Sequence, residues 1–182
     1  KQYNEYSSFQ YSDKMIFTCQ LDTPLGPMLA GATGQGVCLL EFADSGRAAA
    51  QLRRLAGRLG AASAPGESPF FSALRTQLDE YFTGLRRHFS LPLVLAGTPF
   101  QLRVWIALQA IPYGETRTYR ALAAQIGQPE AARAVGSANG ANPLAILVPC
   151  QRLTGADGKL TGYGGGLWRK RRLLEMEGAV SF

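Results

Sequence analysis

The first half of the chain alternates short apolar runs with turn-forming residues. Residues 15–21, 28–32 and 37–42 are dominated by apolar side chains, and Pro, Gly and Thr lie between them. Runs of this length bounded by turn residues are typical of strands, and the short connections favour antiparallel neighbours. We therefore predict an antiparallel three-stranded meander, to which residues 91–95 can add one more strand.

Two other segments of this half carry apolar residues at helical spacing. In residues 48–59 and 70–82 these residues recur every three or four positions, which places them on one face of a helix. Residues 61–69, between the two helices, contain Gly, Pro and Ser and are predicted to form a loop. The predicted buried faces are Leu52, Leu55 and Leu59 in the first helix, and Phe71, Leu74, Leu78 and Tyr81 in the second.

The pattern becomes mostly helical after residue 96. Thr98 followed by Pro99 is a helix N-cap with proline at the first helical position. We predict two domains, residues 1–95, of which 1–14 form a tail or linker, and residues 96–182. The predicted fold class is α+β, with a small antiparallel-sheet domain followed by a helical domain.

Two short helical segments flank a glycine turn in the second half. Residues 118–126 and 130–139 lie on either side of Gly127, which is typical of a helix-turn-helix. The second segment consists mainly of Ala, Gly and Ser, so it can approach either another helix or a nucleic-acid groove closely. Arg133 is the one long cation within it, and an arginine suits a groove or a base stack.

Composition narrows the class of protein. Hydrophobic residues make up 46% and charged residues 18% of 182, which indicates a globular, soluble chain, and the net charge of +6 suits a polyanionic partner. The three cysteines are far apart in the sequence and His88 is the one histidine, so the sequence does not predict a zinc site. Unclustered free cysteines are typical of proteins in a reducing cytoplasm. A first residue Lys1 rather than Met is compatible with a fragment of a longer protein.

The candidate chemistry centres on one cysteine. Residues 146–152, Ile-Leu-Val-Pro-Cys-Gln-Arg, predict a short buried strand stopped by Pro149, with Cys150 held beside Arg152. A nearby guanidinium favours the reactive thiolate. A buried structural cysteine is an equally good interpretation of these seven residues alone, because free cysteine is often buried.

Glycines and cations follow this cysteine. Residues 160–166 form a glycine-rich loop with one tyrosine, but no Gly-Lys-Ser/Thr motif for nucleotide hydrolysis is present. Residues 168–176 predict a basic helix whose buried residues are Leu173 and Leu174. This part of the sequence therefore does not indicate an ATPase or GTPase.

Several motifs in this order resemble the O6-alkylguanine-DNA alkyltransferases. The resemblance covers both domains, from about Met15 to Gly178, and is strongest to Ada-type C-terminal halves, some of which are fused behind a regulatory domain. The matching motifs are Gly114-Glu-Thr116 with Tyr119, Ala131-Ala-Arg-Ala-Val-Gly136, Asn142-Pro143, Val148-Pro-Cys-Gln-Arg152, Gly162-Tyr163, and Leu173-Leu174 through Glu177-Gly178.

The resemblance implies an RNase H-like first domain and direct repair of DNA. The alkyl group on guanine O6 in double-stranded DNA would pass irreversibly to Cys150, once per molecule and without a cofactor or a metal. The protein would act as a cytoplasmic monomer of bacterial type, without a membrane. Alkyl size, base preference and rate are left open.

The resemblance also implies how the helix-turn-helix handles DNA. It would bind the minor groove, Arg133 would fill the gap left by a flipped base, and Tyr119 would help rotate its phosphate. The other residues expected to contact DNA are Thr118, Ala131, Ala132, Gly136 and Ser137.

The flipped base would meet the residues around the thiol. By resemblance, Tyr163 donates to guanine N3 and the amide of Gly164 approaches O6. The carbonyls of Cys150 and Leu153 accept from the exocyclic amine, and Arg152 lies beside them.

One position departs from the family pattern Pro-Cys-His-Arg. Gln151 replaces the histidine that, in the family, takes the thiol proton together with a glutamate, here Glu177. A neutral amide cannot accept a proton at accessible pH. Thiolate formation would then depend on Arg152, on helix N-termini, on Asn142, or on a water that leads to Glu177.

Three hypotheses follow from the resemblance. The first is a single-turnover alkyltransferase with an altered proton relay. The second is a module that binds or senses lesions with weak or no transfer, because Gln151 has replaced the usual histidine. The third is a regulatory DNA-binding domain in which alkylation of Cys150 is a signal. Retention of the cysteine favours the first.

Overall fold

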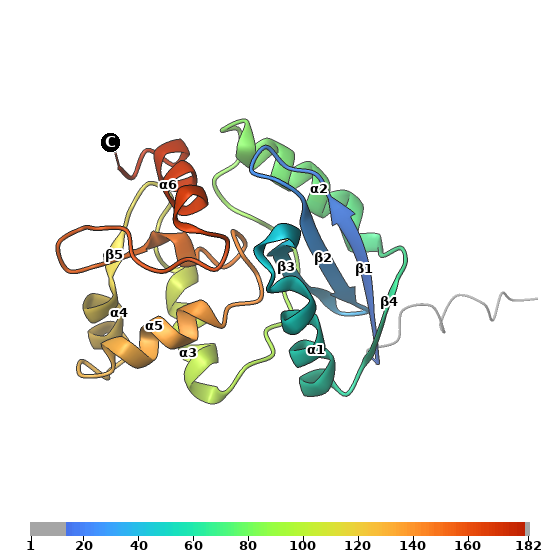
Figure 1. The fold of residues 1–182 in the computed structure, drawn as a ribbon, viewed down its shortest axis with the longest axis horizontal. Coiled ribbons are helices and arrows are strands. Elements are labelled where there is room, and N and C mark those ends of the chain that lie inside the picture. Colours follow the sequence, from blue (N-terminus) through green and yellow to red (C-terminus); the bar gives the residue numbers. More distant parts are fainter. Residues whose placement is uncertain (1–13, 181–182) are drawn as a thin grey trace, which may run out of the picture.

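The computed structural model describes residues 14–180, so all but one residue of the predicted tail, 1–14, lie outside the described residues (Figure 1). The first half is built on a four-stranded sheet in the order β3-β2-β1-β4. Antiparallel pairing joins β1 to β2 and β2 to β3, which confirms the predicted meander, whereas β4 is parallel to β1. The strands are β1 (Met15–Leu21), β2 (Met28–Thr33), β3 (Gly36–Phe42) and β4 (Ala62–Pro65).

Two predictions for this sheet are wrong, so the sheet is mixed rather than antiparallel. The predicted loop 61–69 contains β4, whose Ala-Ser-Ala-Pro sequence has little strand propensity and pairs only as an edge strand with β1. Residues 91–95 form no regular strand, and Leu93 makes a single bridge to Val37. Strand propensity is a weak guide at a sheet edge, because contact with the one neighbouring strand decides whether an edge segment pairs.

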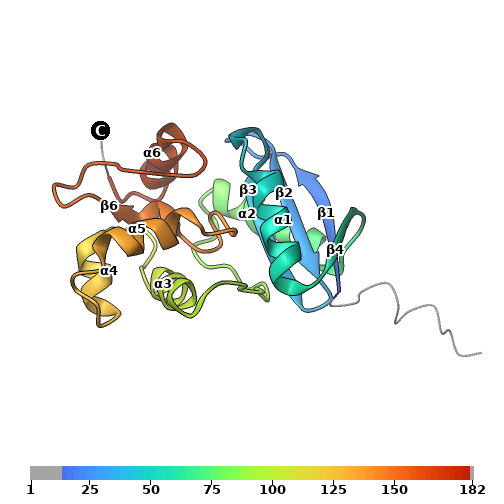
Figure 2. The same ribbon diagram turned by 60° about the horizontal axis from the view of Figure 1, so that its bottom comes forward.

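The two helices of this half lie on opposite faces of the sheet (Figure 2). They are α1 (Ala48–Leu59) and α2 (Pro69–Phe82). The apolar face predicted for α2 is fully buried against β2 and β3, whereas α1 buries Leu55 and leaves Leu52 and Leu59 partly exposed. Because helices cover both faces, every residue of β3 is buried.

The second half is a cluster of short helices, as the sequence predicts (Figure 1). Thr98 starts α3 with a capping box, in which its side chain accepts from the Gln101 amide and the Gln101 side chain accepts from the Thr98 amide. The elements are α3 (Pro99–Gln109), β5 (Arg117–Thr118), α4 (Tyr119–Gln125), α5 (Ala132–Gly140), β6 (Leu153–Thr154) and α6 (Leu167–Met176). Helices α4 and α5 form the predicted helix-turn-helix, and α5 packs on α3, where Trp105 Nε1 donates to the Ala138 carbonyl at 2.9 Å.

Backbone hydrogen bonds join the two halves along the edge of β3. The Leu40 amide donates to the Pro143 carbonyl at 2.8 Å, and the Ala145 amide donates back to Leu40 at 2.8 Å. Val37 makes a comparable pair with residues 92–94 at the end of the first half, so these two bonds cover the same edge without crossing between the halves. These bonds satisfy an edge strand that would otherwise be open to pairing, and they fix the segment leading to Cys150 against the sheet.

A buried hydrogen bond makes a second connection between the halves. Tyr81, at the end of α2, donates its hydroxyl to Glu177 Oε1 at 2.6 Å. Glu177 is the C-cap residue of α6 and is 4% exposed, while Tyr81 is completely buried. The Tyr81 hydroxyl therefore donates to a carboxylate that has little access to water. No helix within residues 14–180 is long and apolar enough to cross a membrane.

We expect Tyr81→Phe to lower the free energy of unfolding by about 2 kcal/mol, because a hydrogen bond to a buried charge contributes about 1.5–3 kcal/mol. The matched control is Tyr113→Phe, whose half-buried hydroxyl donates to the neutral Met176 carbonyl at 3.2 Å. That bond should contribute about 1 kcal/mol or less. Urea unfolding of both variants measures the difference, and equal losses would show that Glu177 does not depend on Tyr81.

Candidate active site

Cys150 lies at the end of a tightly folded loop. The strand predicted over residues 146–149 is not formed; this segment runs as successive turns, and Cys150 begins the short 3-10 helix η2 (Cys150–Arg152). Ile146 has a φ of 71°, in the left-handed region that β-branched residues rarely adopt. Such strain persists only where the surroundings impose it, so tertiary contacts decide this loop.

The Asn142 side chain organises the loop from within. Its amide nitrogen donates to the Val148 carbonyl at 3.0 Å and to the Leu144 carbonyl at 3.4 Å, while its oxygen accepts from the Leu144 amide at 3.0 Å. It also forms a hydrogen bond to the Cys150 thiol. One buried amide therefore closes the loop and contacts the reactive sulfur.

The thiol of Cys150 is protonated at neutral pH. It is 6% exposed, and this burial raises its pKa to about 11. The hydrogen bond from Asn142 lowers the pKa, the Glu41 carboxylate raises it, and the cations Lys170 and Arg47 lower it. Burial outweighs the cations, so the environment of the free protein does not by itself supply a thiolate.

Arg152 does not serve the thiol, contrary to the expectation from the sequence. Its Nε donates to Glu177 Oε2 at 2.8 Å, and a second nitrogen donates to Oε1 at 3.3 Å. A third bond, at 2.6 Å, goes to the Ile111 carbonyl. The side chains of Arg152 and Glu177 are 8% and 0% exposed, so this is a buried ion pair that holds η2 against α6.

Gln151 completes the shell around the same carboxylate. Its Nε2 donates to Glu177 Oε1 at 2.9 Å, and the side chain is completely buried. Its Oε1 is buried and has no hydrogen-bond partner among residues 14–180. The amide therefore supports Glu177 as a donor, and it has no basic atom to offer the thiol.

Two cavities meet at Cys150. The outer cavity, of about 210 Å³, is lined by Arg47, Tyr119, Gly136, Asn139, Gly140, Cys150, Gly162, Tyr163 and Gly164. The inner cavity, of about 10 Å³, is lined by Glu41, Arg47, Asn139, Gly140, Asn142, Ala145, Cys150, Tyr163, Gly164 and Gly165. The outer cavity borders α4 and α5 through Tyr119 and Gly136, and the inner cavity borders β3 through Glu41.

The residues predicted to contact DNA lie on α4 and α5. Arg133 and Ser137 are exposed on α5, and Gly136 lies against the Tyr119 ring. Tyr119 itself donates to the Thr161 carbonyl at 3.2 Å. The predicted contacts that are only partly exposed are Thr118, whose side chain caps α4, and Ala131 and Ala132.

Tyr163 and Gly164 line both cavities. The Tyr163 hydroxyl has no hydrogen-bond partner within residues 14–180. A Cβ on Gly164 would come within 2.6 Å of the Arg47 guanidinium, so a larger residue here would have to displace the end of that side chain. Leu153, by contrast, is completely buried in β6 and lines neither cavity.

Three residues of the site were not found by sequence reasoning. Glu41 and Arg47 come from the first domain, in which the sequence indicated no candidate site residue. Lys170 was assigned to a basic helix, but it is completely buried, and its ammonium donates to the Thr161 carbonyl at 2.6 Å, while burial lowers its pKa to about 8. A signal existed for Glu41, the lone charge in the apolar run 37–42.

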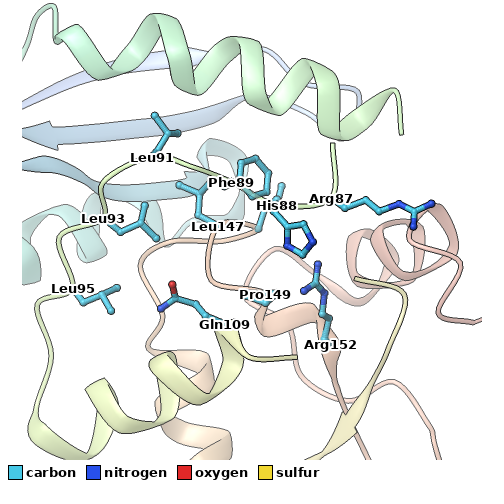
Figure 3. A pocket seen from close by; sticks show the side chains of 11 residues that line it. Arg87, His88, Phe89, Leu91, Leu93, Leu95, Gln109, Leu147, Pro149 and Arg152 are labelled. Atoms are coloured by element: carbon cyan, nitrogen blue, oxygen red, sulfur yellow. The ribbon is translucent and has the colours of Figure 1, made fainter. Parts of the chain in front are cut away.

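A separate cavity of about 360 Å³ lies behind the loop and does not include the thiol among its lining residues (Figure 3). His88 and Arg152 approach each other at one end of it, and Leu91, Leu93 and Leu95 line another side. Within residues 14–180, no group of His, Cys, Asp or Glu side chains is placed to hold a metal ion.

We expect alkylation of Cys150 by iodoacetamide to accelerate about tenfold per pH unit from about pH 7 to 10, because the thiolate fraction rises until the pH reaches the pKa of about 11. Peptide mass spectrometry resolves each cysteine. Cys38, which is completely buried and whose pKa burial raises to about 12, is the slow internal control. A plateau of the Cys150 rate below about pH 9 would contradict the raised pKa.

Two family models match the chain and together span nearly all the described residues. The model of the 6-O-methylguanine DNA methyltransferase ribonuclease-like domain matches residues 16–95. The model of the 6-O-methylguanine DNA methyltransferase DNA-binding domain matches residues 99–179.

Individual relatives agree with these matches. A methylated-DNA–protein-cysteine methyltransferase from Mycobacterium tuberculosis is 49% identical over 163 residues, covering 90% of this chain and 93% of the relative. One from Methanosarcina barkeri is 43% identical over 86% of this chain and 94% of the relative. The crystal structure of Mycobacterium tuberculosis OGT in complex with DNA superposes with a TM-score of 0.75 at 47% identity, covering 91% and 93% of the two chains. The chain therefore belongs to the O6-methylguanine DNA methyltransferase family.

Proposed function

We propose that this protein repairs O6-alkylguanine in double-stranded DNA by transferring the alkyl group irreversibly to its own Cys150. The observation that carries the proposal is that this thiol lines the outer cavity together with Tyr119 of α4 and Gly136 of α5, the two helices of the helix-turn-helix. At about 210 Å³, the cavity is below the ~300–1,000 Å³ typical of drug-sized ligands and suits one nucleobase.

DNA would bind along α5, and the damaged nucleotide would turn out of the duplex into the outer cavity. Arg133, exposed on α5, would enter the gap that the base leaves. Extrusion costs a few kcal/mol, and less for a weakly paired damaged base, so the lesion is favoured over intact guanine. The structure of Mycobacterium tuberculosis OGT in complex with DNA supports DNA as the partner.

Inside the cavity, unpaired polar atoms are available to hold the base. The Tyr163 hydroxyl and Asn139 Oδ1 are buried without hydrogen-bond partners among residues 14–180. One donor and one acceptor can therefore bind a ligand without breaking an existing hydrogen bond. The Cys150 sulfur would attack the alkyl carbon as the bond from that carbon to O6 breaks. The product is a stable thioether, so each molecule reacts once and needs no cofactor or metal.

The alternative is a module that binds the lesion and transfers slowly or not at all. Two observations favour it: the pKa of the Cys150 thiol is raised to about 11, and Gln151 offers no base. Both lower the thiolate supply without affecting DNA binding. Regulation through alkylated Cys150 in a longer protein remains compatible with the same site. Transfer to Cys150 separates the repair function from the module that only binds the lesion.

We expect incubation with a duplex containing O6-methylguanine to add about 14 Da to the intact protein, the mass of one CH₂ on a thiol nucleophile. Cys150→Ala should show no gain. Cys19→Ala, the same change at a half-buried cysteine in the sheet, should gain the mass as the unmodified chain does. Tight binding to the lesion without any gain over hours would assign the protein to the lesion-binding class.

We expect Arg133→Ala to slow transfer at least about tenfold while binding to undamaged duplex changes little, because extrusion of a base costs a few kcal/mol that the inserted side chain offsets. Single-turnover rates and binding to the matched duplex measure the two effects. Arg53→Ala removes the same charge from an exposed position on α1 and should leave both unchanged. Equal losses of transfer and of undamaged binding would show that Arg133 only contacts phosphate.

A further inference from the structure

We propose that Glu41 accepts the proton of the Cys150 thiol through a water molecule in the inner cavity, in place of the residue at position 151. This inference rests on the proposed function, because the proton must leave the sulfur for the alkyl group to be transferred. It assigns to the N-terminal sheet a part in the reaction that the sequence placed wholly in the second domain.

The route through position 151 is closed by the geometry. Gln151 donates Nε2 to Glu177 and has no atom that takes a proton at accessible pH. Glu177 Oε1 already accepts from Tyr81, Gln151 and Arg152, and Oε2 accepts from Arg152. A carboxylate whose two oxygens accept four hydrogen bonds has little room for a proton delivered from Cys150.

Glu41 is the other carboxylate at the thiol. It is 2% exposed and lies between Leu40 and Phe42 at the end of β3. The backbone of Leu40 is hydrogen-bonded to both ends of the turn at residues 143–145. The same pairing that anchors the cysteine loop therefore fixes Glu41 relative to Cys150, and both line the inner cavity.

The partners of Glu41 leave it able to take a proton. Its Oε1 accepts from the Phe42 amide at 3.2 Å, and its Oε2 lies 3.6 Å from Arg47 Nε. That separation is longer than a charge-assisted hydrogen bond, at about 2.7–2.9 Å. Glu41 thus lacks the close, multiple contacts that occupy Glu177, although it is equally buried.

The inner cavity has the size and the polar walls for one water. Its volume of about 10 Å³ matches the lower limit of about 10–15 Å³ for a single buried water, which also needs two to four polar partners. Four are present: Glu41, the Cys150 thiol, and the Tyr163 hydroxyl and Asn139 Oδ1, which have no partner among residues 14–180. A water here would accept from the thiol, donate to Glu41 and donate to a lone pair of the Tyr163 or Asn139 oxygen, which connects sulfur to carboxylate and leaves the Tyr163 proton and the other Asn139 lone pair for the base.

The charges that face this pair favour proton transfer. Burial raises the pKa of Glu41 above its ordinary value, while Arg47 from α1, the Phe42 amide and Arg169 from α6 lower it. Glu41 therefore binds a proton more readily than a solvated carboxylate does. Facing the thiol are Arg47 and also Lys170 from α6, which stabilise the thiolate once the proton has left.

The transfer balances without another reactant. The thiol proton passes to the water as a proton of that water passes to Glu41. The sulfur–carbon bond forms, the carbon–O6 bond breaks, and the guanine leaves as an anion that takes one proton from water. Glu41 returns its proton to water, so the net result moves one proton from Cys150 to guanine.

The first test needs no substitution. With Glu41 as acceptor, the single-turnover rate on an O6-methylguanine duplex should rise as Glu41 ionises, at a pH above its ordinary value of 4.5, and then level off. If the thiol instead loses its proton directly to solvent, the rate should rise about tenfold per unit from about pH 6 to 9, because the pKa of the thiol is about 11. That continuous rise would overturn the proposal.

The second test removes the acceptor. Glu41→Gln keeps the shape and the acceptor for the Phe42 amide, loses the ion pair with Arg47, and cannot take a proton. We expect it to slow transfer about 10²-fold, at the low end of general-base effects. Its rate should also lose the plateau. Glu80→Gln makes the same change at the surface, in an ion pair with Arg86, and should transfer at the original rate. Binding to the lesion duplex, measured for each variant, reports on folding.

The third test is rescue. In Glu41→Gln with Gln151→His, an imidazole replaces the amide beside Glu177 and supplies a base at the residue next to Cys150. We expect the double variant to transfer at least about tenfold faster than Glu41→Gln alone. Transfer by Glu41→Gln at the original rate would overturn this inference while the proposed function stands. No mass gain by the unmodified chain would overturn the proposed function instead.

Discussion

The buried carboxylate of Glu177 is the interaction on which the rest of the structure depends. It gathers hydrogen bonds from α2 through Tyr81 and from the cysteine loop through Gln151 and Arg152, while its own backbone closes α6. A buried charge is tolerated only when it is fully paired, so these segments must meet in one arrangement. Fixing Arg152 in this way also removes it from the thiol, which is why the cysteine does not benefit from its adjacent arginine.

The edge of β3 supplies the second constraint. An open sheet edge presents unpaired amides and carbonyls, and here residues 92–94 and 143–145 cover it. The cysteine loop therefore folds against the sheet instead of forming a strand of its own, and Ile146 takes a φ of 71° as a consequence. The same pairing brings a residue of the first domain to the reactive sulfur, so the two halves form one site.

Burial raises the pKa of both the Cys150 thiol and the Glu41 carboxylate, and the two shifts have opposite consequences for the reaction. It raises the pKa of Cys150 to about 11, which protects the thiol but withholds the nucleophile. It also raises the pKa of Glu41, which makes that carboxylate a better proton acceptor. A neutral glutamine at position 151 is compatible with transfer only if a proton acceptor lies elsewhere, and the inner cavity offers both the acceptor and the space for a water between them.

The sequence alone determined the parts of the protein that depend on local chemistry. Helical periodicity predicted α2 with its buried face, Thr98 and Pro99 predicted the start of α3, and the glycine turn predicted the pair α4 and α5. These features follow from residues within one or two turns of each other. The spaced motifs around Cys150 likewise indicated the family before any contact was known.

Only the tertiary structure decided the features that depend on distant partners. β4 forms because β1 offers an edge to pair with, and the run before Pro149 becomes a turned loop because Leu40 and Asn142 hold it. Glu41 is a single charge within an apolar strand in the sequence, and nothing local shows that it faces Cys150. The pKa of a thiol, and the identity of the group that accepts its proton, depend on burial and on charges from other segments. Both are set by the folded structure and not by the order of residues near the cysteine.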